Sequence, residues 1–513
     1  MAATEEMKEQ LRESVRNDGP GESPTPRATI STDRLPVRCL SMRIGQTSVV
    51  NFLSQVATSI FGFIVTIYLA RELGDAVLGN YFLVVSVLVW LKVLGGQGIQ
   101  MALRKRVSEG RMEERYFGGG LLLQLGAVAV LAIAVVVFRG PLNDYLRTEA
   151  ALMLAVLLVT GLLLWQVRAA LEGRHRVAAS SLLRPLDRTV RGVLQIGVVA
   201  VGLATVNWLL AGYAVAELLA ALAGLSLLAI RPRLPTREQL RSLLEYAKYS
   251  WFSGIESRTF ASMDTLVLAI PAFAISSGQI GVYEVAWNLA SVLAVFGASV
   301  RMTLFPAISE LSSAGEDGIE GLIDDAVAYS GLFVIPGLVG CAVVGRRVLA
   351  IYGTEFTRGY TILLVLVAAR LLYVYQSQFT NVLAAIDRPD SAFRVNVTFV
   401  ATNLVLNVAL VAFVGWLGAA VATATSAMVG LVLSYWYLRK YVTIPIPIGE
   451  LASQVLAAVA MGVVVFVARG LAGAGVAWTI ALVAVGGGTY FATLTVLSRR
   501  FRATVRRNLP VPI

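Results

Sequence analysis

Long apolar runs separated by short polar stretches dominate the chain from Gln46 onward. The runs are continuous rather than alternating, which excludes the strands of a membrane β-barrel and predicts α-helices. Each run is close to the roughly 20 residues that a helix needs to cross a bilayer. We predict fourteen spans, at residues 46–70, 77–96, 116–138, 148–168, 187–204, 206–230, 246–272, 279–305, 326–345, 359–385, 392–414, 416–437, 451–468 and 475–497.

The composition is that of a membrane protein. Of the 513 residues, 57% are hydrophobic and only 15% are charged, whereas soluble domains carry about 25% charged residues. The mean hydropathy is +0.72. These values exclude a soluble enzyme, a fibrous protein and a wholly disordered chain. The expected fold class is an all-α polytopic membrane protein.

Positive charges gather in alternate loops, the pattern that orients membrane proteins with their basic loops in the cytoplasm. They cluster at residues 104–115, 174–184, 231–241 and 499–507. Both termini are therefore expected in the cytoplasm of a multi-pass plasma-membrane protein. Because the basic residues are distributed as membrane orientation requires, the net charge of +11 does not indicate a nucleic-acid partner.

Two loops disagree with this pattern. Residues 310–325 belong on the inner side but hold only acidic charges, and the loop with Arg346, Arg347 and Arg358 belongs on the outer side. Acidic residues have little weight in the rule, so the orientation is kept.

The two halves of the chain resemble each other. The sequence LGNY at Leu78 and the sequence IGVY at Ile280 open corresponding spans 202 residues apart. Six spans separate them, so both halves have the same orientation, as in a parallel repeat. Such a repeat reflects either duplication alone or two lobes around a substrate path. The predicted parts are a disordered cytoplasmic tail (1–45), an N-lobe (46–230), a cytoplasmic amphipathic linker (231–245), a C-lobe (246–438), two appended helices (450–498) and a basic cytoplasmic tail (499–513).

The linker carries a helix-start signal. Thr236 and Gln239 have the spacing of a capping box. The apolar residues that follow share one helical face, which predicts an interfacial helix. They are Leu240, Leu243, Leu244 and Ala247.

Motifs of known catalytic chemistry are missing from the sequence. It has no P-loop, no Ser–His–Asp arrangement and no His/Cys set with metal-ligand spacing. His175 is the single histidine, and Cys39 and Cys341 are expected to be free thiols. We therefore expect no catalytic residue, no metal and no cofactor, and a protein that is not an enzyme.

Charged side chains inside the predicted spans are the candidates for function, because they are costly in a bilayer. If a span begins near Tyr246, Arg258 lies roughly 18 Å inside the membrane, near its midplane. On the same helix Glu256 and Asp264 project within about 80° of each other, whereas Arg258 points elsewhere. The candidates singled out are Lys92, Glu217, Glu256, Arg258, Asp264, Glu284, Arg301 and Arg370.

Two interpretations of these charges compete. They line a hydrated cavity for an anionic substrate, or they form ion pairs that hold helices together. We favour the cavity for the helix with Arg258 and a structural pair for Glu217 and Arg370. Lys92 and Arg301 line the cavity or extend to lipid headgroups, and polar residues of the first span line the path or bridge helices. The substrate-binding candidates are Arg258, Glu256, Asp264, Arg301, Lys92, Asn51 and Gln55.

Several short motifs, in their order and spacing, resemble one family of transporters. They are Ala70-Arg71-Glu72-Leu73-Gly74, Gly79-Asn80-Tyr81, Met263-Asp264-Thr265-Leu266, Gly281-Val282-Tyr283 and Phe305-Pro306-Ala307-Ile308-Ser309. The chain resembles, over residues 45–500, the multidrug/oligosaccharidyl-lipid/polysaccharide (MOP) exporter superfamily. Within it the resemblance is to the polysaccharide transporters and lipid-linked oligosaccharide flippases. Several loops resemble those of archaeal members.

The resemblance implies two six-helix lobes around a cavity lined by the first, second, seventh and eighth spans. It implies flipping of polyisoprenoid-(pyro)phosphate-linked glycans across the plasma membrane by alternating access, for surface polysaccharide or glycoprotein biosynthesis. Cationic cavity residues would meet the phosphate and acidic sugars. The implied partners are the lipid-linked glycan, membrane lipids and glycosyltransferases of the same pathway.

Three other classes of protein are considered. A cation-coupled multidrug antiporter shares the fold but usually has an acidic residue in its first span, and none lies between Gln46 and Ala70. A membrane-embedded glycan-processing enzyme needs a long outer loop for its catalytic groups. The longest predicted outer loop, Arg346–Tyr360, has only 15 residues. A non-transporting scaffold needs no charges at the midplane.

Overall fold

The computed structural model describes residues 37–110, 112–251, 255–314, 318–473 and 475–508. These ranges contain α-helices, short π- and 3₁₀-helical turns and connecting loops, and no β-strand. The predicted all-α fold is therefore confirmed. The described residues before Leu53 form a unit separate from the one that begins there. The packing described below belongs to the second unit.

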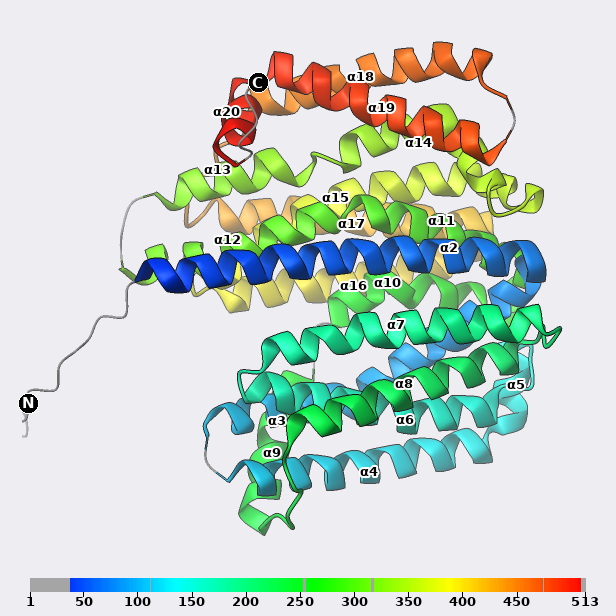
Figure 1. Ribbon diagram of the computed structural model, residues 1–513, viewed down its shortest axis with the longest axis vertical. Helices are drawn as coiled ribbons and strands as arrows, with labels where there is room; N and C mark the ends of the chain where they lie inside the picture. The colour runs from blue at the N-terminus through cyan, green and yellow to red at the C-terminus, as the bar shows by residue number, and fades with distance from the viewer. Residues whose placement is uncertain (1–36, 111, 252–254, 315–317, 474, 509–513) are drawn as a thin grey trace, which may run out of the picture. The chain divides into compact units, whose positions relative to one another are not determined.

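The first part of that unit is the N-terminal helix group, α2 to α8. In this group α6 packs against α4 and α8, and α8 packs against α7 (Figure 1). The helix α2 kinks at Gly74, whose positive φ of 73° suits glycine. It contains the first predicted span and residues 77–92 of the second. The elements are α2 (Val37–Lys92), the π-helical turn η1 (Val93–Gln97), α3 (Gly98–Ser108), α4 (Glu113–Val137), α5 (Arg139–Leu146), α6 (Ala151–Gly173), α7 (Val177–Ala200) and α8 (Val206–Leu228).

The second part is the C-terminal helix group, α10 to α17, followed by three further helices. Here α17 packs between α15 and α16, and α18 packs against α14 and α19. The elements are α10 (Ile255–Leu268), η2 (Pro271–Phe273), α11 (Ser277–Leu293), α12 (Val295–Ala314), α13 (Ile319–Ser330), α14 (Val334–Ala350), η3 (Thr354–Gly359), α15 (Tyr360–Ala385), α16 (Pro389–Val414), α17 (Trp416–Leu438), α18 (Ile448–Leu471), α19 (Val476–Leu497) and α20 (Arg499–Asn508).

Within the described residues, ten helices are long and apolar enough to cross a membrane, or eleven if the pair α11 and α12, bent by 45°, is one span. This establishes a multi-pass membrane protein but not the number fourteen. One of the ten runs from Thr58 to Ser108 and so combines two predicted spans. Even when the count is eleven, two predicted spans are left over, because α7 carries four charged residues and α10 has only 14 residues.

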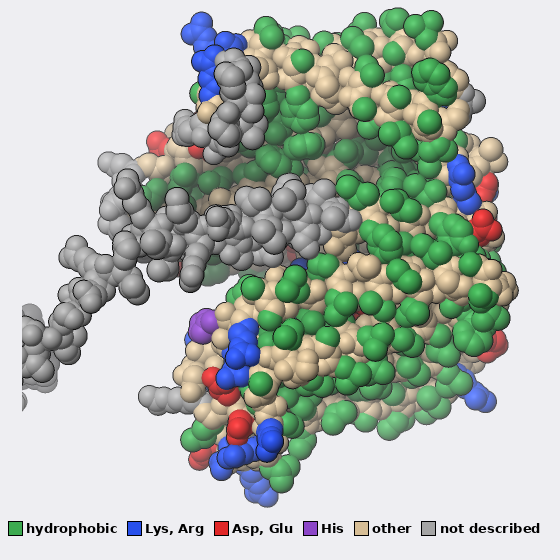
Figure 2. Space-filling view, viewed as in Figure 1, with side chains coloured by type: hydrophobic (Ala, Val, Ile, Leu, Met, Phe, Trp, Pro, Cys, Tyr) green, Lys and Arg blue, Asp and Glu red, His purple; other side chains and the backbone are tan. Residues whose placement is uncertain are grey.

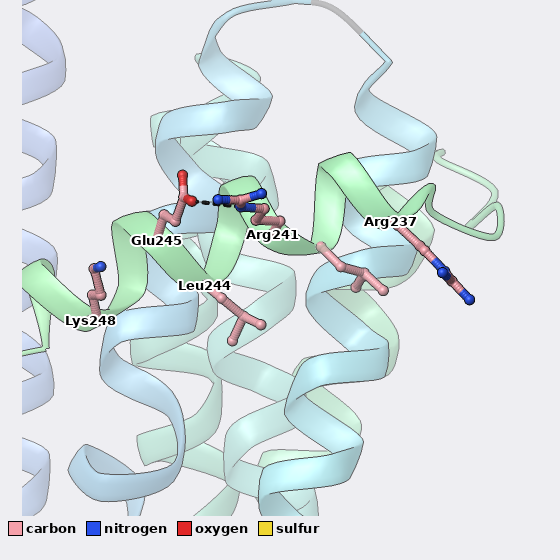
Figure 3. A pocket seen from close by; sticks show the side chains of 6 residues that line it. Arg237, Arg241, Leu244, Glu245 and Lys248 are labelled. Carbon is pink, nitrogen blue, oxygen red and sulfur yellow. Dashed lines mark hydrogen bonds and ion pairs between the residues drawn. The ribbon is translucent and has the colours of Figure 1, made fainter.

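The predicted linker helix is present as α9 (Arg237–Ser250), with the capping box of Thr236 and Gln239 formed in both directions. It crosses the neighbouring helices at a steep angle (Figure 3). Its buried Leu243 packs toward α3 and α4, whereas Leu244 is 50% exposed. Residues 246–250 thus belong to α9 and not to the span predicted to start at Tyr246. Arg258 accordingly lies in the first described turn of α10, so its depth in the membrane cannot be counted from a helix start at Tyr246.

The flank of the helices is apolar. Hydrophobic side chains cover it in Figure 2, whereas lysine and arginine gather toward the helix ends. Large apolar side chains remain exposed along it, for example Val130 at 68%. Such a surface is suited to contact with lipid, because exposing an apolar patch of this extent to water is unfavourable.

Candidate functional site

One face of α7 carries a row of arginines. Arg184, Arg188 and Arg191 follow each other at intervals of four and three residues, a spacing that places side chains on one side of a helix. Asp187 lies between them and is buried. A helix with this row cannot face lipid, since a charge in hydrocarbon is costly. The row lies against a cavity instead.

The cavity has a volume of about 540 Å³ and is bounded by the N-terminal helix group and the start of α10. Three acidic side chains line it, against seven basic ones, so its lining has an excess of positive charge. The acidic residues are Glu172, Asp187 and Glu217. The basic residues are Lys92, Arg104, Arg168, Arg184, Arg188, Arg191 and Arg258.

The three acidic residues pair with four of the seven basic ones. Glu172 accepts from Arg104 at 3.2 Å and lies 3.6 Å from Arg168. Asp187 pairs with Arg191, whose guanidinium stacks on the Tyr213 ring at 3.4 Å. The remaining pair joins Glu217 to the lysine at the end of α2.

The pair of Lys92 and Glu217 is buried and tightly packed. The Lys92 ammonium lies 2.6 Å from Glu217 Oε1, and Thr160 donates to the other carboxylate oxygen at 3.0 Å. A Cβ on Gly161 would lie 1.8 Å from Lys92 Nζ, so a larger residue there would displace the lysine from its present position. The predicted cavity residue Lys92 thus has a carboxylate partner in the N-terminal group. It lies next to the π-helical turn Val93–Gln97, a feature frequent at functional sites.

The other three arginines have no such partner. Arg184, Arg188 and Arg258 make no ion pair or hydrogen bond with any described residue. Arg184 lies near enough to Arg258 for their charges to repel. Guanidinium groups bind phosphate or carboxylate through paired hydrogen bonds. An anion in the cavity would supply the missing negative charge and relieve the repulsion.

A second cavity, of about 470 Å³, shares Arg188 and Arg191 with the first. Its other polar lining is neutral, from hydroxyl and amide groups of α2, α7 and α11, together with aromatic rings. Groups of this kind bind the hydroxyls and apolar faces of sugar rings. They include Phe63, Thr66, Tyr81, Gln195, Asn288 and Tyr352.

The predicted acidic residues of α10 belong to the C-terminal helix group. Asp264 is buried and accepts hydrogen bonds from Tyr283, from Asn407 at 2.9 Å and from Thr423 at 2.8 Å to each oxygen. Glu256 accepts from Tyr373 at 3.2 Å and from Gln376 at 3.3 Å. Neither carboxylate lies in the arginine-lined cavity.

Two more arginines from the sequence list lie elsewhere. Arg301, on α12, is half-buried and does not line the arginine-rich cavity. Arg370, on α15, donates to Ser291 at 2.5 Å and stacks on Trp287 and Phe260. The ion pair expected to hold Arg370 is therefore absent among the described residues, and aromatic rings take the place of a carboxylate.

Asn51 and Gln55 lie outside the described side chains, so the structure does not place their polar groups. Their assignment to the path stays a prediction.

The arginines of α6 and α7 were missed in the sequence. Arg184 falls in a predicted loop, where basic residues indicate orientation, and Arg168 falls at the end of a predicted span. The signal that could have found the row on α7 is its periodicity, with positions 184, 188 and 191 one helical turn apart. The first span lacks basic residues, but α6 and α7 supply them to the same group of helices.

The helices and the cavity define a class: a polytopic α-helical membrane transporter with a basic internal cavity. The chain belongs to the polysaccharide biosynthesis protein family, whose model matches residues 44–312, more than half of the sequence. The expected resemblance to polysaccharide transporters is thereby confirmed at the level of the family.

Two curated relatives extend over almost the whole chain. One, named "Probable flippase AglR" from Haloferax volcanii, is 28% identical over 474 residues, which cover 91% of this chain and 98% of the relative. The other, named "Probable low-salt glycan biosynthesis flippase Agl15" from the same organism, is 29% identical over 473 residues, covering 91% and 99%.

Solved structures support the fold. The lipid II flippase MurJ, in an inward closed conformation, superimposes with a TM-score of 0.76 at 15% identity, over 89% of this chain and 100% of that one. A multidrug-resistance MATE transporter of the MOP superfamily, in an inward-facing conformation, gives 0.58 at 14% identity, over 75% and 94%. At these identities the likeness concerns the fold alone.

Proposed function

We propose that this protein is a flippase that moves a polyisoprenoid-linked oligosaccharide across the plasma membrane by alternating access. The glycan would serve surface polysaccharide or glycoprotein biosynthesis. Both curated relatives are named as flippases, and one name refers to glycan biosynthesis. The family to which the chain belongs is described by polysaccharide biosynthesis.

The observation that carries the proposal is the set of unpaired arginines in the first cavity. Arg184, Arg188 and Arg258 are available to a phosphate, because the acidic side chains of the cavity already have partners. A lipid-linked glycan presents a phosphate or pyrophosphate between its lipid and its first sugar. The second cavity, which shares Arg188, would receive the sugars beside that phosphate.

The proposed binding set therefore differs from the one expected in the sequence. Arg258 remains in it, with Arg184 and Arg188 as its neighbours. Lys92 acts through its pair with Glu217, which shapes the cavity wall. Glu256 and Asp264 would act within the C-terminal helix group during the conformational cycle and not as substrate ligands.

The proposal includes an orientation with both termini in the cytoplasm. It rests on the basic loops near α3, α7 and α9 and on the basic helix α20. The first cavity lies toward that side, because it is lined by Arg104 near the end of α3 and by Glu172 near the end of α6. A substrate made in the cytoplasmic leaflet would enter there.

Transport in this account involves no covalent step and no cofactor. The arginines hold the substrate, and a movement of helices changes the side to which the cavities open. The partners that follow are the lipid-linked glycan, the surrounding lipids and the glycosyltransferases that assemble the glycan.

A deletion strain tests the proposal. Without the gene, a surface glycan or protein glycosylation should decrease and the lipid-linked precursor should accumulate, while drug sensitivity stays unchanged. Wild-type protein should restore the glycan, as should a variant with Arg394→Gln, an exposed arginine of α16 outside the cavity. Unaltered glycans together with new drug sensitivity would contradict the proposal and favour a multidrug antiporter.

A further inference from the structure

Three arginines lie close together where α14 and α18 end. By the distribution of basic loops this is the outer end of the molecule, where few positive charges are expected. Arg346 and Arg347 lie in the last turns of α14, and Arg469 lies near the end of α18. Together they line a cavity of about 380 Å³. The rest of its lining is Ala342, Val343, Tyr360 and Gly470, so no carboxylate takes part in it.

Two of these arginines form hydrogen bonds that join α14 to α18. Arg347 donates to the carbonyl oxygens of Gly473, Arg469 and Ala472, at 3.0 to 3.2 Å. Arg469 donates to the carbonyl oxygen of Val343 at 3.1 Å. Arg347 thereby satisfies carbonyl groups at the C-terminal end of α18, where the helix dipole favours a cation, whereas Arg469 bonds to the middle of α14. These bonds join α18 to α14.

Arg346 takes no part in the hydrogen bonds between these helices. It is exposed and makes no hydrogen bond or ion pair with any described residue. Its guanidinium lies 5.0 Å from the centre of the Tyr360 ring, which leaves its N–H groups free. Three positive charges share one small cavity, and only carbonyl dipoles and aromatic faces balance them.

We propose that this cavity, lined by Arg346, Arg347 and Arg469, binds the phosphate of an anionic membrane lipid. Three guanidinium groups with no carboxylate among the lining residues favour a phosphate, which accepts paired hydrogen bonds. Arg346 supplies the free donors, and the other two add their charge. The bound lipid would bridge α14 of the C-terminal helix group and the appended helix α18.

A lipid rather than a soluble phosphate fits the surroundings. The same stretch of α18 exposes Phe466, Val467 and Leu471, the last at 85%. An acyl chain would cover this apolar surface while the headgroup reaches the arginines. The leaflet at this end is the outer one in the proposed orientation. The inference concerns a resident lipid, so it does not depend on the substrate that the protein moves.

The test compares purified protein in nanodiscs of phosphatidylcholine with and without phosphatidylglycerol. We expect the melting temperature of the wild type to rise with phosphatidylglycerol, and native mass spectrometry to detect a retained anionic lipid. In Arg346→Gln both effects should be lost. This variant breaks none of the carbonyl bonds that join α14 to α18, so its melting temperature in phosphatidylcholine should match that of the wild type.

Arg139→Gln is the matched control, because Arg139 is an exposed arginine at the start of α5 outside this cavity. It should keep the full rise in melting temperature, and Arg346→Lys should keep part of it. An equal rise in Arg346→Gln would overturn the proposal. If inorganic phosphate in phosphatidylcholine discs reproduces the rise, the ligand is free phosphate and the assignment to a lipid is wrong.

Discussion

Gly79 of α2 and Gly281 of α11 occupy equivalent places in the internal repeat, and their helices touch there. A Cβ on Gly79 would lie 1.9 Å from the carbonyl oxygen of Ser277, and a Cβ on Gly281 would lie 2.1 Å from that of Asp75. Asp75 and Ser277 are themselves 202 residues apart, so the two halves of the repeat contribute equivalent residues to this contact. Arg358 reinforces it through an ion pair with Asp75. Only glycine permits this approach, which closes the two helix groups against each other.

Enlarging Gly79 should open this closure. In Gly79→Ala the new methyl group cannot fit against the backbone of α11, so α2 and α11 should separate and admit water to the second cavity. A cysteine at Asn288, which lines that cavity, should then react faster with a membrane-impermeant thiol reagent added outside, in protein lacking Cys39 and Cys341. Gly126→Ala, on α4 with open space around it, is the control. Unchanged labelling in folded Gly79→Ala protein would contradict a closing role for this contact.

The pair of Lys92 and Glu217 should contribute to stability more than to substrate binding. Glu217→Gln leaves a buried ammonium without its carboxylate, which costs about 3–5 kcal/mol of the free energy of unfolding. Adding Lys92→Met should restore most of the loss, as measured by thermal denaturation in detergent.

The exposed pair of Arg241 and Glu245 on α9 provides the comparison (Figure 3). Its side chains are 81% and 56% exposed, so changing Glu245 to Gln should cost less than about 1 kcal/mol. Equal losses at the two pairs would show that burial does not decide the effect.

Arg258 should matter for transport and not for folding. Arg258→Ala should abolish most glycan export, and Arg258→Lys should lose much of it, because ammonium lacks the paired donors of guanidinium. Neither variant strands a carboxylate, since Glu217, Glu256 and Asp264 all bond to other residues. The melting temperature should therefore stay close to that of the wild type. Normal export by folded Arg258→Ala protein would end the assignment to substrate contact.

The orientation can be checked with reporters. A reporter fused after Arg507 should report the cytoplasm, as should one inserted near Arg111, because basic loops stay inside. A reporter at Gly353, between α14 and α15, should report the outside despite the arginines around it. If the fusions at Arg507 and Gly353 report the same side, the number of spans between them is not the one predicted.

The sequence predicted the helical fold well because apolar runs of bilayer length have few alternatives. It also predicted α9 from the capping box of Thr236, a local signal that needs no tertiary contact. The boundary near Tyr246 could not be predicted, because the apolar residues at the end of α9 continue without a break in the sequence pattern toward those of α10. The bend between α11 and α12 and the two-part structure of α13 and α14 depend on packing that no local pattern records.

Partners of charged residues were harder to predict than their positions. The pair of Lys92 and Glu217 joins residues 125 positions apart, and only the packing of α2, α6 and α8 brings them together. Arg258 was recognised because a charge in an apolar span is unusual. Arg184 and Arg188 are harder to recognise, although their spacing places them on one face, because Arg184 falls in a predicted loop and Arg188 is only the second residue of a predicted span.

The lipid that copurifies with the protein tests the central claim most directly. Wild-type protein extracted from its native membrane should carry a polyisoprenoid-linked glycan phosphate, identified by mass spectrometry. The variant with Arg188→Gln and Arg258→Gln should lose it, while Arg394→Gln should retain it at the wild-type level. If no such lipid accompanies the wild type, or if the double variant carries as much of it, the arginine-lined cavity does not hold the phosphate of a lipid-linked glycan.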